Sequence, residues 1–249
     1  MKTICIYNNK GGVGKTSLSG AIAVEFVIKG KKVLIVDTDS QGNLSTQFMN
    51  KEPIKNELAD YLNDDSIGLE NCMYNTRYDN LYIVPTKEMV DGGKMNDWMS
   101  KSDKNPEIVK YLVEDAKKLG FDYLIFDTAP AFSETNQKFM LASDEVIPVL
   151  QIAKTSMDGL VNYYSGLKKI KGRSEKPLSN KLIFNQYEKT KTVQKALISS
   201  IMELESKKYL IPVDQAFRKA ELNGVAPQEI GIKSETQESM NQLIADIEG

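Results

Sequence analysis

The sequence predicts an α/β fold in which helices flank a doubly wound, mainly parallel β-sheet. Short and almost continuously apolar runs alternate with helical stretches along the chain, which is typical of strands that are buried on both faces. The 249 residues, of which 41% are hydrophobic and 27% are charged, are enough for a substantial core. Because no internal repeat, low-complexity tract or interdomain linker interrupts the pattern, residues 1–249 are predicted to form one domain.

The order of the expected elements follows from these apolar runs and their spacing. Strands are expected at residues 3–7, 31–36, 81–84, 121–127, 145–150, 181–185 and 209–213. Helices are expected after the first strand and at residues 106–119, 134–142, 156–170, 190–206 and 235–247. Residues 86–105, with Gly92-Gly93 and scattered polar side chains, are expected to form a long surface loop.

A glycine-rich segment, Asn9-Lys10-Gly11-Gly12-Val13-Gly14-Lys15-Thr16, lies between the first strand and a helix that Gly30 can end. Strand, glycine loop and helix in this order are the context of a phosphate-binding loop. The glycines let successive N–H groups turn inward, and the helix N-terminus adds its positive end. Lys15 is expected to reach the β- and γ-phosphates of a nucleotide, and the Thr16 hydroxyl to ligate Mg²⁺.

The loop departs from the ordinary G-x-x-x-x-G-K-[ST] motif, because Asn9 replaces the first glycine and a second lysine, Lys10, precedes a Gly-Gly pair. A flexible turn with surface lysines is the simplest alternative, but seven positions and both flanks agree with a phosphate loop. K-G-G-x-G-K-[ST] is the deviant Walker A motif, and the segment resembles the ParA/MinD family of P-loop ATPases. The resemblance extends over nearly the whole chain and is strongest at residues 3–46 and 121–131.

The resemblance implies a Mg²⁺-dependent ATPase that binds ATP through the loop from Lys10 to Ser17 and hydrolyses it to ADP and phosphate. It also implies a homodimer that forms around two ATP molecules. In that dimer Lys10 reaches the partner's nucleotide and neutralises charge as phosphoryl transfer proceeds, in the role of an arginine finger. Without the resemblance, Lys10 is a solvated lysine beside an anion.

Two aspartates follow the second expected strand in the segment Asp37-Thr38-Asp39-Ser40-Gln41-Gly42-Asn43. The segment matches the first switch of the family, with Ser40 at a position where proline is usual. By the resemblance, Asp39 helps to orient the attacking water, and Asp37 supports the magnesium ion and the loop. The structural alternative is an Asp-rich turn that ends a strand and caps a helix.

A third aspartate, Asp127, ends the apolar run 121–127 in a Walker B pattern. This pattern places a carboxylate beside Mg²⁺ at the C-terminal edge of a parallel sheet. The resemblance implies that Asp127 holds Mg²⁺ through a water and that the residues after it form the second switch, in which Ala129 replaces a usual proline. In other contexts an aspartate that ends a core strand is often only a turn residue.

Polar residues at two further strand ends are expected to contact the adenine base. Asn185 and Gln186 follow one apolar run, and Pro212 to Asp214 follow another, at edges where related proteins often place such contacts. A polar residue at the end of a strand usually belongs to a turn, so the expected nucleotide contacts of Asn185, Pro212 and Asp214 depend on position alone.

Composition excludes several classes of chemistry. The chain has no histidine, which excludes Ser-His-Asp and Cys-His catalysis and most zinc sites but fits phosphoryl transfer. Cys5 and Cys72 provide neither a disulfide framework nor the spacing of a metal site. No signal peptide opens the chain, and no apolar run approaches the roughly 18 residues of a membrane-spanning helix. We therefore expect a cytoplasmic protein.

Charge is distributed unevenly along the chain, although the net charge is only −2. Residues 168–195 contain nine basic side chains and two acidic ones, whereas residues 221–249 contain six acidic side chains and one lysine. Such a basic stretch is more often a solvated helix face than a nucleic-acid site. The resemblance reverses this preference, because nonspecific DNA binding is typical of the partition branch of the family. The expected DNA contacts are Lys168, Lys169, Lys171, Arg173, Arg218 and Lys219.

Three classes of function compete. The first is a ParA-like ATPase for plasmid or chromosome partition, of the small form without an N-terminal helix-turn-helix. Such a protein would be nucleoid-associated, and a ParB-like centromere-binding partner would stimulate it. A MinD-like membrane regulator is disfavoured because residues 234–249 are acidic and anionic lipids would repel them. A protein like the nitrogenase iron protein would need paired cysteines, which the chain lacks. A ParA-like ATPase that positions a protein cargo remains the nearest rival to partition.

Overall fold

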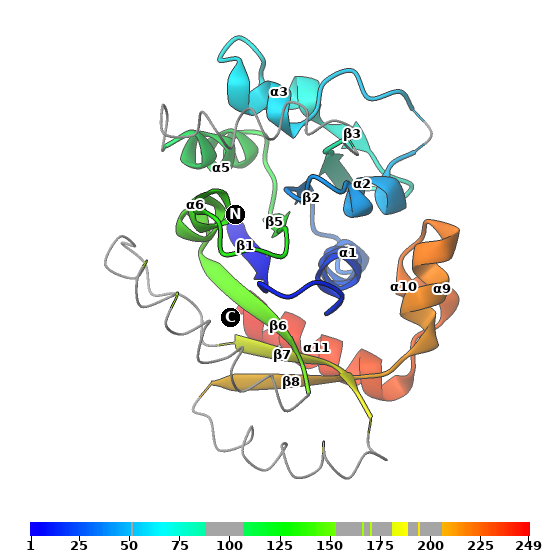
Figure 1. The fold of residues 1–249 in the computed structure, drawn as a ribbon. Helices are drawn as coiled ribbons and strands as arrows, with labels where there is room; N and C mark the ends of the chain where they lie inside the picture. The colour runs from blue at the N-terminus through cyan, green and yellow to red at the C-terminus, as the bar shows by residue number, and fades with distance from the viewer. Residues whose placement is uncertain are drawn as a thin grey trace.

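The computed structural model describes residues 1–50, 52–87, 107–152, 181–188 and 206–249, together with Gly166, Ile170 and Gln194. Within this part of the chain, eight strands form one sheet in the order β3-β4-β2-β5-β1-β6-β7-β8 (Figure 1). Neighbouring strands run parallel except for the short β3, which is antiparallel to β4. The predicted fold class, a mainly parallel sheet flanked by helices, is therefore confirmed.

The elements have the following bounds. The strands are β1 Lys2–Tyr7, β2 Val33–Asp37, β3 Tyr74–Asn75, β4 Leu81–Val84, β5 Tyr123–Asp127, β6 Glu145–Gln151, β7 Lys181–Tyr187 and β8 Lys207–Pro212. The helices are α1 Lys15–Ile28, α2 Asn43–Phe48, α3 Leu58–Asn63, the 3₁₀ helix η1 Leu69–Cys72, α5 Ile108–Lys118, α6 Glu134–Ala142, α9 Gln215–Asn223, α10 Pro227–Ile230 and α11 Ser234–Glu248.

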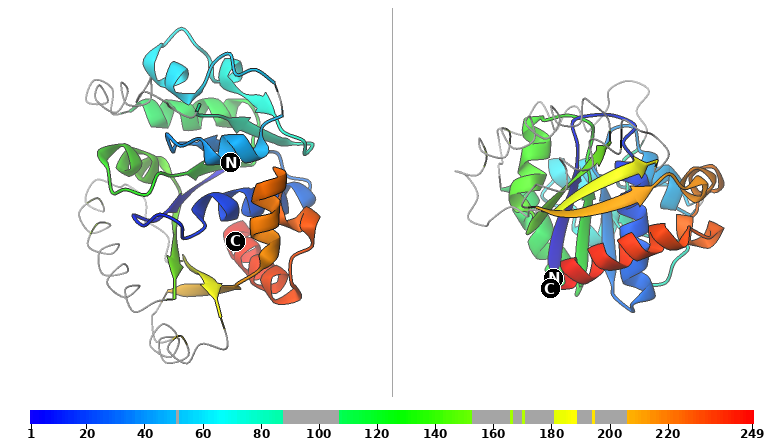
Figure 2. Two further views of the ribbon diagram at one scale, coloured as in Figure 1. Left: turned by 45° about the vertical axis from the view of Figure 1, so that its right-hand side comes forward. Right: turned by 90° about the horizontal axis from the view of Figure 1, so that it is seen from below.

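Helices cover both faces of the sheet (Figures 1 and 2). Alternate strand residues point to opposite faces, so Ile35 and Ile125 join one core cluster, and Leu34 and Leu124 join another. The first cluster includes apolar side chains of α1 and α11, and the second includes those of α3, α5 and α6. The strands are apolar on both faces for this reason, as the sequence pattern indicated.

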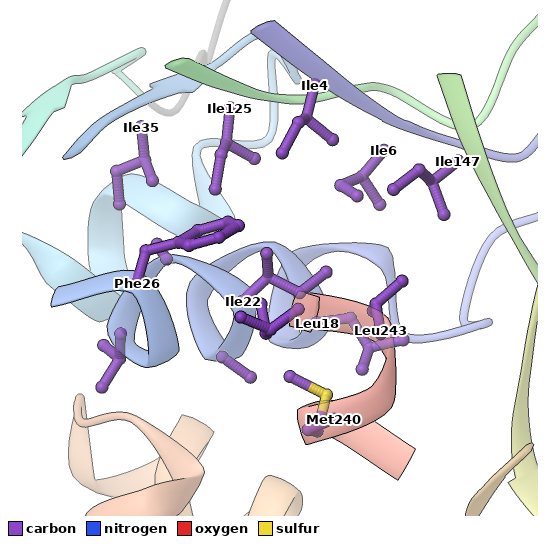
Figure 3. Packing of buried hydrophobic residues seen from close by; sticks show 14 of the residues in the cluster. Ile4, Ile6, Leu18, Ile22, Phe26, Ile35, Ile125, Ile147, Met240 and Leu243 are labelled. Atoms are coloured by element: carbon purple, nitrogen blue, oxygen red, sulfur yellow. The ribbon is translucent and has the colours of Figure 1, made fainter. Parts of the chain in front are cut away.

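Helix α1 lies at the centre of the first cluster. Figure 3 shows the isoleucines of the strands on one side of α1 and Met240 and Leu243 of α11 on the other, and Leu18, Ile22 and Phe26 of α1 belong to the same cluster. Phe26 stacks on the ring of Tyr123 with a centroid distance of 3.7 Å. This packing fixes the helix, and with it the loop that precedes the helix.

Gly30 ends α1 as predicted. It has a φ of +76°, and the Lys31 N–H donates to the Phe26 carbonyl at 3.0 Å while the Gly30 N–H donates to the Val27 carbonyl at 2.8 Å. These two bonds form a Schellman motif, which needs a left-handed residue and so favours glycine. The helix therefore ends just before β2 begins.

The centre of the sheet is also its topological switch point. β1 lies between β5 and β6, and the chain then continues to β2 on the far side of β5. The register pairs Asp127 of β5 with Ile6 of β1 and with Asp37 of β2, so the carboxyl ends of these strands meet at one edge. Ligands of open α/β sheets bind at such an edge.

Several elements differ from the expectations. The short helices α2, α3, η1, α9 and α10, of four to nine residues, and the two-residue strand β3 were not predicted, because such short segments carry too little periodicity to be recognised. The expected helices at 156–170 and 190–206 and most of the expected loop at 86–105 lie outside the described residues. No helix in the described ranges is long and apolar enough to cross a bilayer.

Candidate nucleotide-binding site

The glycine loop leaves β1 at the sheet edge and enters α1 at Lys15. Gly12 and Gly14 have φ values of +73° and +91°, which lie in the left-handed region that favours glycine. Asn8 anchors the start of the loop, because its Oδ1 accepts the Lys10 N–H at 2.9 Å and its amide donates to the Val149 carbonyl of β6. Asn8 thus ties the start of the loop to the neighbouring strand β6.

The two lysines of the loop have different environments. Lys15 is 7% exposed, whereas Lys10 is exposed at the tip of the loop. Burial lowers the pKa of Lys15, and the nearby charges of Asp127 and Asp39 oppose this shift. The Lys15 ammonium donates to the Lys10 carbonyl at 3.4 Å and is directed along the loop. Its location beside the loop N–H groups suits the predicted phosphate contact.

Asp127 lies at the end of β5 with 1% of its surface exposed. Its Oδ1 accepts the Ser19 hydroxyl at 2.9 Å, and its buried Oδ2 accepts no hydrogen bond. Burial raises the pKa of Asp127 to about 6, although the Thr16 and Ser19 side chains and Lys15 lower it. No sequence pattern points to Ser19, which is one turn into α1.

The residues present fit a Mg²⁺ ion. Oxygen ligands suit Mg²⁺, Oδ2 of Asp127 is unpartnered, and the Thr16 side chain is close enough to Asp127 to lower the pKa of that carboxyl. In the described ranges, no group of three or more acidic or cysteine side chains could hold a metal ion by itself. Mg²⁺ is usually bound through one or two side chains together with water and substrate phosphates, so this arrangement suits a nucleotide-bound ion.

Asp37 and Asp39 hold the segment after β2 in place. Asp37 accepts the Ser45 N–H at 2.8 Å, the Ser45 hydroxyl at 2.7 Å and the Asp39 N–H at 3.1 Å. Burial, and next the charge of Asp127, raises the pKa of Asp37 to about 8, although these hydrogen bonds oppose the rise. Asp39 is 9% exposed and its Oδ1 accepts the Gln41 N–H at 3.0 Å. Asp37 therefore orders the start of α2, while Asp39 faces the same edge as Lys15.

The segment after β5 is held by one buried amide. Asn136 of α6 donates to the Ala129 carbonyl at 2.8 Å and to the Ala131 carbonyl at 2.6 Å. The Thr128 hydroxyl donates to the Ile6 carbonyl of β1 at 2.7 Å. Sequence reasoning missed Asn136, since a polar residue early in a helix resembles many capping residues.

A pocket of about 390 Å³ adjoins the glycine loop. Its lining brings together residues that are far apart in sequence: Gly14, Ser17, Asn185, Gln186, Pro212, Val213, Asp214, Gln215, Phe217, Arg218 and Glu221. The predicted base contacts Asn185, Pro212 and Asp214 are all among them. Phe217, which the sequence did not single out, adds an aromatic ring at the pocket wall.

Two of these residues also form hydrogen bonds with other parts of the protein. Asn185 donates from Nδ2 to the Val13 carbonyl at 2.8 Å. Asp214 caps α9 through the Ala216 N–H at 3.0 Å, and its Oδ2 accepts the Lys233 N–H at 2.7 Å and the Thr236 hydroxyl at 2.9 Å. Asp214 thus joins the start of α9 to the start of α11.

The expected DNA contacts are only partly within the described residues. Lys168, Lys169, Lys171 and Arg173 lie outside them. Arg218 and Lys219 are exposed on α9, and Arg218 also lines the pocket beside the glycine loop. Their contact with DNA stays a prediction.

Comparison with known proteins agrees with this geometry. A family model described as an AAA domain matches residues 1–183. The uncharacterized protein BBD21 of Borreliella burgdorferi is 32% identical over 192 residues, which are 76% of each chain. The chromosome-partitioning ATPase Soj of Treponema pallidum is 26% identical over 199 residues, which are 79% of this chain and 76% of Soj.

Solved structures share the fold. Apo McdA of Cyanothece has a TM-score of 0.84 at 18% identity, with both chains covered completely. A putative plasmid partition protein of Borrelia burgdorferi B31, bound to AMPPNP, has a TM-score of 0.76 at 23% identity and covers 99% of this chain and 97% of its own. Because the family model spans the glycine loop and all three aspartates, and the relatives include partition ATPases, the chain belongs to the ParA/MinD-type family of P-loop ATPases.

Proposed function

We propose that this protein is a Mg²⁺-dependent ATPase of the DNA-partition type, which dimerises around two ATP molecules and binds DNA without sequence preference as a dimer. The observation that carries the proposal is the pair of lysines in one loop, with Lys15 buried beside the aspartates and Lys10 exposed at the tip. Lys15 would bind the chain's own nucleotide, and Lys10 would be available for another role.

The residues of one subunit would divide the chemistry as follows. The loop N–H groups and Lys15 bind the β- and γ-phosphates, and Thr16 and Asp127 hold Mg²⁺, the latter through a water. When bound, Mg²⁺ supplies positive charge to the phosphate oxygens. Asp39 orients the attacking water, because its carboxylate lies at the same edge as Lys15 and Asp127. Asp37 supports this arrangement by ordering the backbone of Asp39.

Lys10 would act in the partner's site. Its side chain starts from an exposed position at the tip of the loop, whereas Lys15 is buried and would contact the phosphates of its own subunit. A lysine that approaches the partner's triphosphate stabilises the charge that develops as the phosphoryl group leaves. This requirement for two subunits would keep hydrolysis slow until dimers form.

The partition role is supported by relatives and by charge. Soj of Treponema pallidum is a chromosome-partitioning ATPase, and the AMPPNP-bound structural neighbour is a putative plasmid partition protein. The basic stretch 168–195 would contact DNA phosphates, with Arg218 and Lys219 adding further contacts. A ParB-like, centromere-binding protein would stimulate hydrolysis, and the complex would reside on the nucleoid in the cytoplasm.

A DNA-binding titration tests this proposal. Binding of one subunit should be weak, with a Kd on the order of 10⁻⁴ M at physiological salt, whereas a dimer links two basic stretches and binds much more tightly. Wild-type protein should therefore bind DNA of any sequence with ATP, much less with ADP, and should lose affinity steeply as salt is raised from about 50 to 200 mM.

Charge reversal separates a DNA surface from a general effect of charge. Replacing Lys168, Lys169, Lys171 and Arg173 by glutamate should abolish DNA binding while ATP-driven dimerisation survives. The matched control replaces four lysines that are exposed in the described part of the chain, Lys29, Lys110, Lys117 and Lys118, by glutamate and should retain DNA binding. If the ATP-bound wild-type dimer has no affinity for DNA at low salt, the partition role is wrong and an ATPase that positions a protein cargo is the better hypothesis.

A further inference from the structure

The end of β7 has an irregular backbone. Its register with β8 shifts between Phe184 and Tyr187, and Gln186 has a φ of +58°. A left-handed backbone is uncommon for residues other than glycine, asparagine and aspartate, and a bulge re-aims the side chains beside it. Such strain tends to persist at functional sites, where the surrounding structure maintains it. Here the irregularity falls beside the glycine loop.

The side chains at this bulge and at the end of β6 hold two successive carbonyls of the loop. Gln151 donates from Nε2 to the Gly12 carbonyl at 3.2 Å and also to Oε1 of Gln186. Asn185 donates from Nδ2 to the Val13 carbonyl at 2.8 Å. The strands β6 and β7 are neighbours in the sheet (Figure 1), and Gln151 is paired with Asn185 in register, so the two donors come from adjacent positions.

Gly14 makes this approach possible. A Cβ atom at position 14 would lie 2.3 Å from Nδ2 of Asn185, and the φ of +91° there also disfavours a side chain. Gly14 therefore leaves the space that the Asn185 amide occupies, and it also suits the turn of the loop.

The direction of these carbonyls sets the direction of the phosphate-binding groups. In a planar trans peptide the C=O of one residue and the N–H of the next point in opposite directions. A Gly12 carbonyl held toward Gln151 turns the Val13 N–H away from it, and a Val13 carbonyl held toward Asn185 does the same for the Gly14 N–H. Phosphate loops bind their ligand through such inward N–H groups.

We propose that Gln151, Asn185 and Gln186 form a clamp that aims the Val13 and Gly14 N–H groups at the triphosphate. Gln151 and Asn185 are positioning residues for the phosphate chain, and Gln186 positions Gln151. The inference rests on the nucleotide binding in the proposed function. It assigns to the end of β7 a task that does not require the base.

A ligand that lacks the adenine base distinguishes a clamp on the glycine loop from a direct contact with the base. Binding of ATP and of inorganic tripolyphosphate, both with Mg²⁺, is measured by titration calorimetry for wild type, Gln151→Ala and Asn185→Ala. Loss of a hydrogen bond that orders the loop should weaken both ligands by a similar factor, on the order of tenfold. The control, Gln242→Ala on the exposed face of α11, should bind both ligands as wild type does.

A further variant tests whether Gln186 acts through Gln151. Gln186→Ala should weaken both ligands less than Gln151→Ala does, and adding it to Gln151→Ala should cause no further loss, because Gln186 acts through Gln151. Thermal unfolding without ligand should place all variants close to wild type.

Two outcomes would overturn the clamp. Variants that lose ATP affinity but bind tripolyphosphate as wild type does would show that these side chains serve the base. Unchanged affinity for both ligands would show that the loop is ordered without them. Neither result depends on DNA, so a failure of the partition role remains distinguishable.

Discussion

Asp37 and Asp127 are paired in register at the ends of the neighbouring parallel strands β2 and β5. Burial raises the pKa of both, to about 8 and about 6, and the charge of Asp127 adds to the rise at Asp37. Their hydrogen bonds nevertheless differ. Both oxygens of Asp37 accept bonds from Ser45 or Asp39, whereas Oδ2 of Asp127 accepts none. The pair therefore combines one carboxylate that orders the backbone with one that keeps an unpartnered oxygen.

The unpartnered oxygen of Asp127 leads to a prediction for Asp127→Asn. Asparagine keeps an acceptor for the Ser19 hydroxyl but provides no negative charge for Mg²⁺. Wild-type protein should bind ATP more tightly with Mg²⁺ than with EDTA, and the variant should bind ATP about equally in both. Equilibrium titration with a fluorescent ATP analogue measures the difference. A variant that keeps the full Mg²⁺ effect would refute the assignment of Asp127.

The two loop lysines should respond differently to truncation. Lys15→Ala removes the charge beside the phosphates and should weaken ATP binding by about 100-fold or more. Lys10→Ala should leave ATP affinity within about threefold of wild type but should impair dimerisation and hydrolysis, because its target lies on the partner. ATP titration and light scattering separate these effects. An equal loss of ATP affinity in both variants would contradict the division of roles.

Asp214 gives a pH-dependent prediction that concerns stability alone. Burial raises its pKa, but hydrogen bonds from the Lys233 and Ala216 N–H groups and the Thr236 hydroxyl outweigh this and lower the pKa overall. A carboxyl with a depressed folded pKa stabilises the fold above its unfolded pKa, and this stability is lost as pH falls through the folded value. Its contribution should be constant from neutral pH to about pH 5 and should decline below about pH 4.

The corresponding experiment compares Asp214→Ala with wild type by urea unfolding across this pH range. Loss of the cap should cost about 1–2 kcal/mol near pH 7, and the difference between the two proteins should shrink below about pH 4. Asp65→Ala, at an exposed turn, is the control and should change stability by less than about 0.5 kcal/mol. A difference that stays constant down to about pH 3 would show that the carboxylate charge is not what stabilises the start of α9.

The sequence predicted most of the sheet because its strands are buried on both faces and read as continuous apolar runs. It placed Lys15 and Asp127 near one another because the carboxyl ends of parallel strands share an edge. It could not reveal that Ser19 bonds Asp127 or that Gln151 bonds Gly12, since these contacts span 108 and 139 residues and leave no local pattern. The bulge at Gln186 was also hidden, because glutamine has no preference for a left-handed backbone.

Removing the water-orienting carboxylate should stop the cycle after ATP binding. Asp39→Ala keeps Lys15, Thr16 and the loop, so the variant should bind ATP and dimerise while hydrolysis falls about 100-fold or more. Gel filtration with ATP and Mg²⁺ should show a dimer that persists, with little phosphate released. A variant that stays monomeric under saturating ATP would defeat the role given to Asp39.

Mixing two inactive variants tests most directly whether Lys10 acts across the dimer. Lys10→Ala and Asp39→Ala proteins are combined before ATP and Mg²⁺ are added, and phosphate release is followed. In a mixed dimer the nucleotide on the Lys10→Ala subunit has that subunit's Asp39 and the partner's Lys10, so one complete site forms. With random pairing, hydrolysis should recover to as much as about a quarter of the wild-type rate. If Lys10 served its own subunit, no mixed dimer would contain a complete site, and a mixture as inactive as its components would contradict the account.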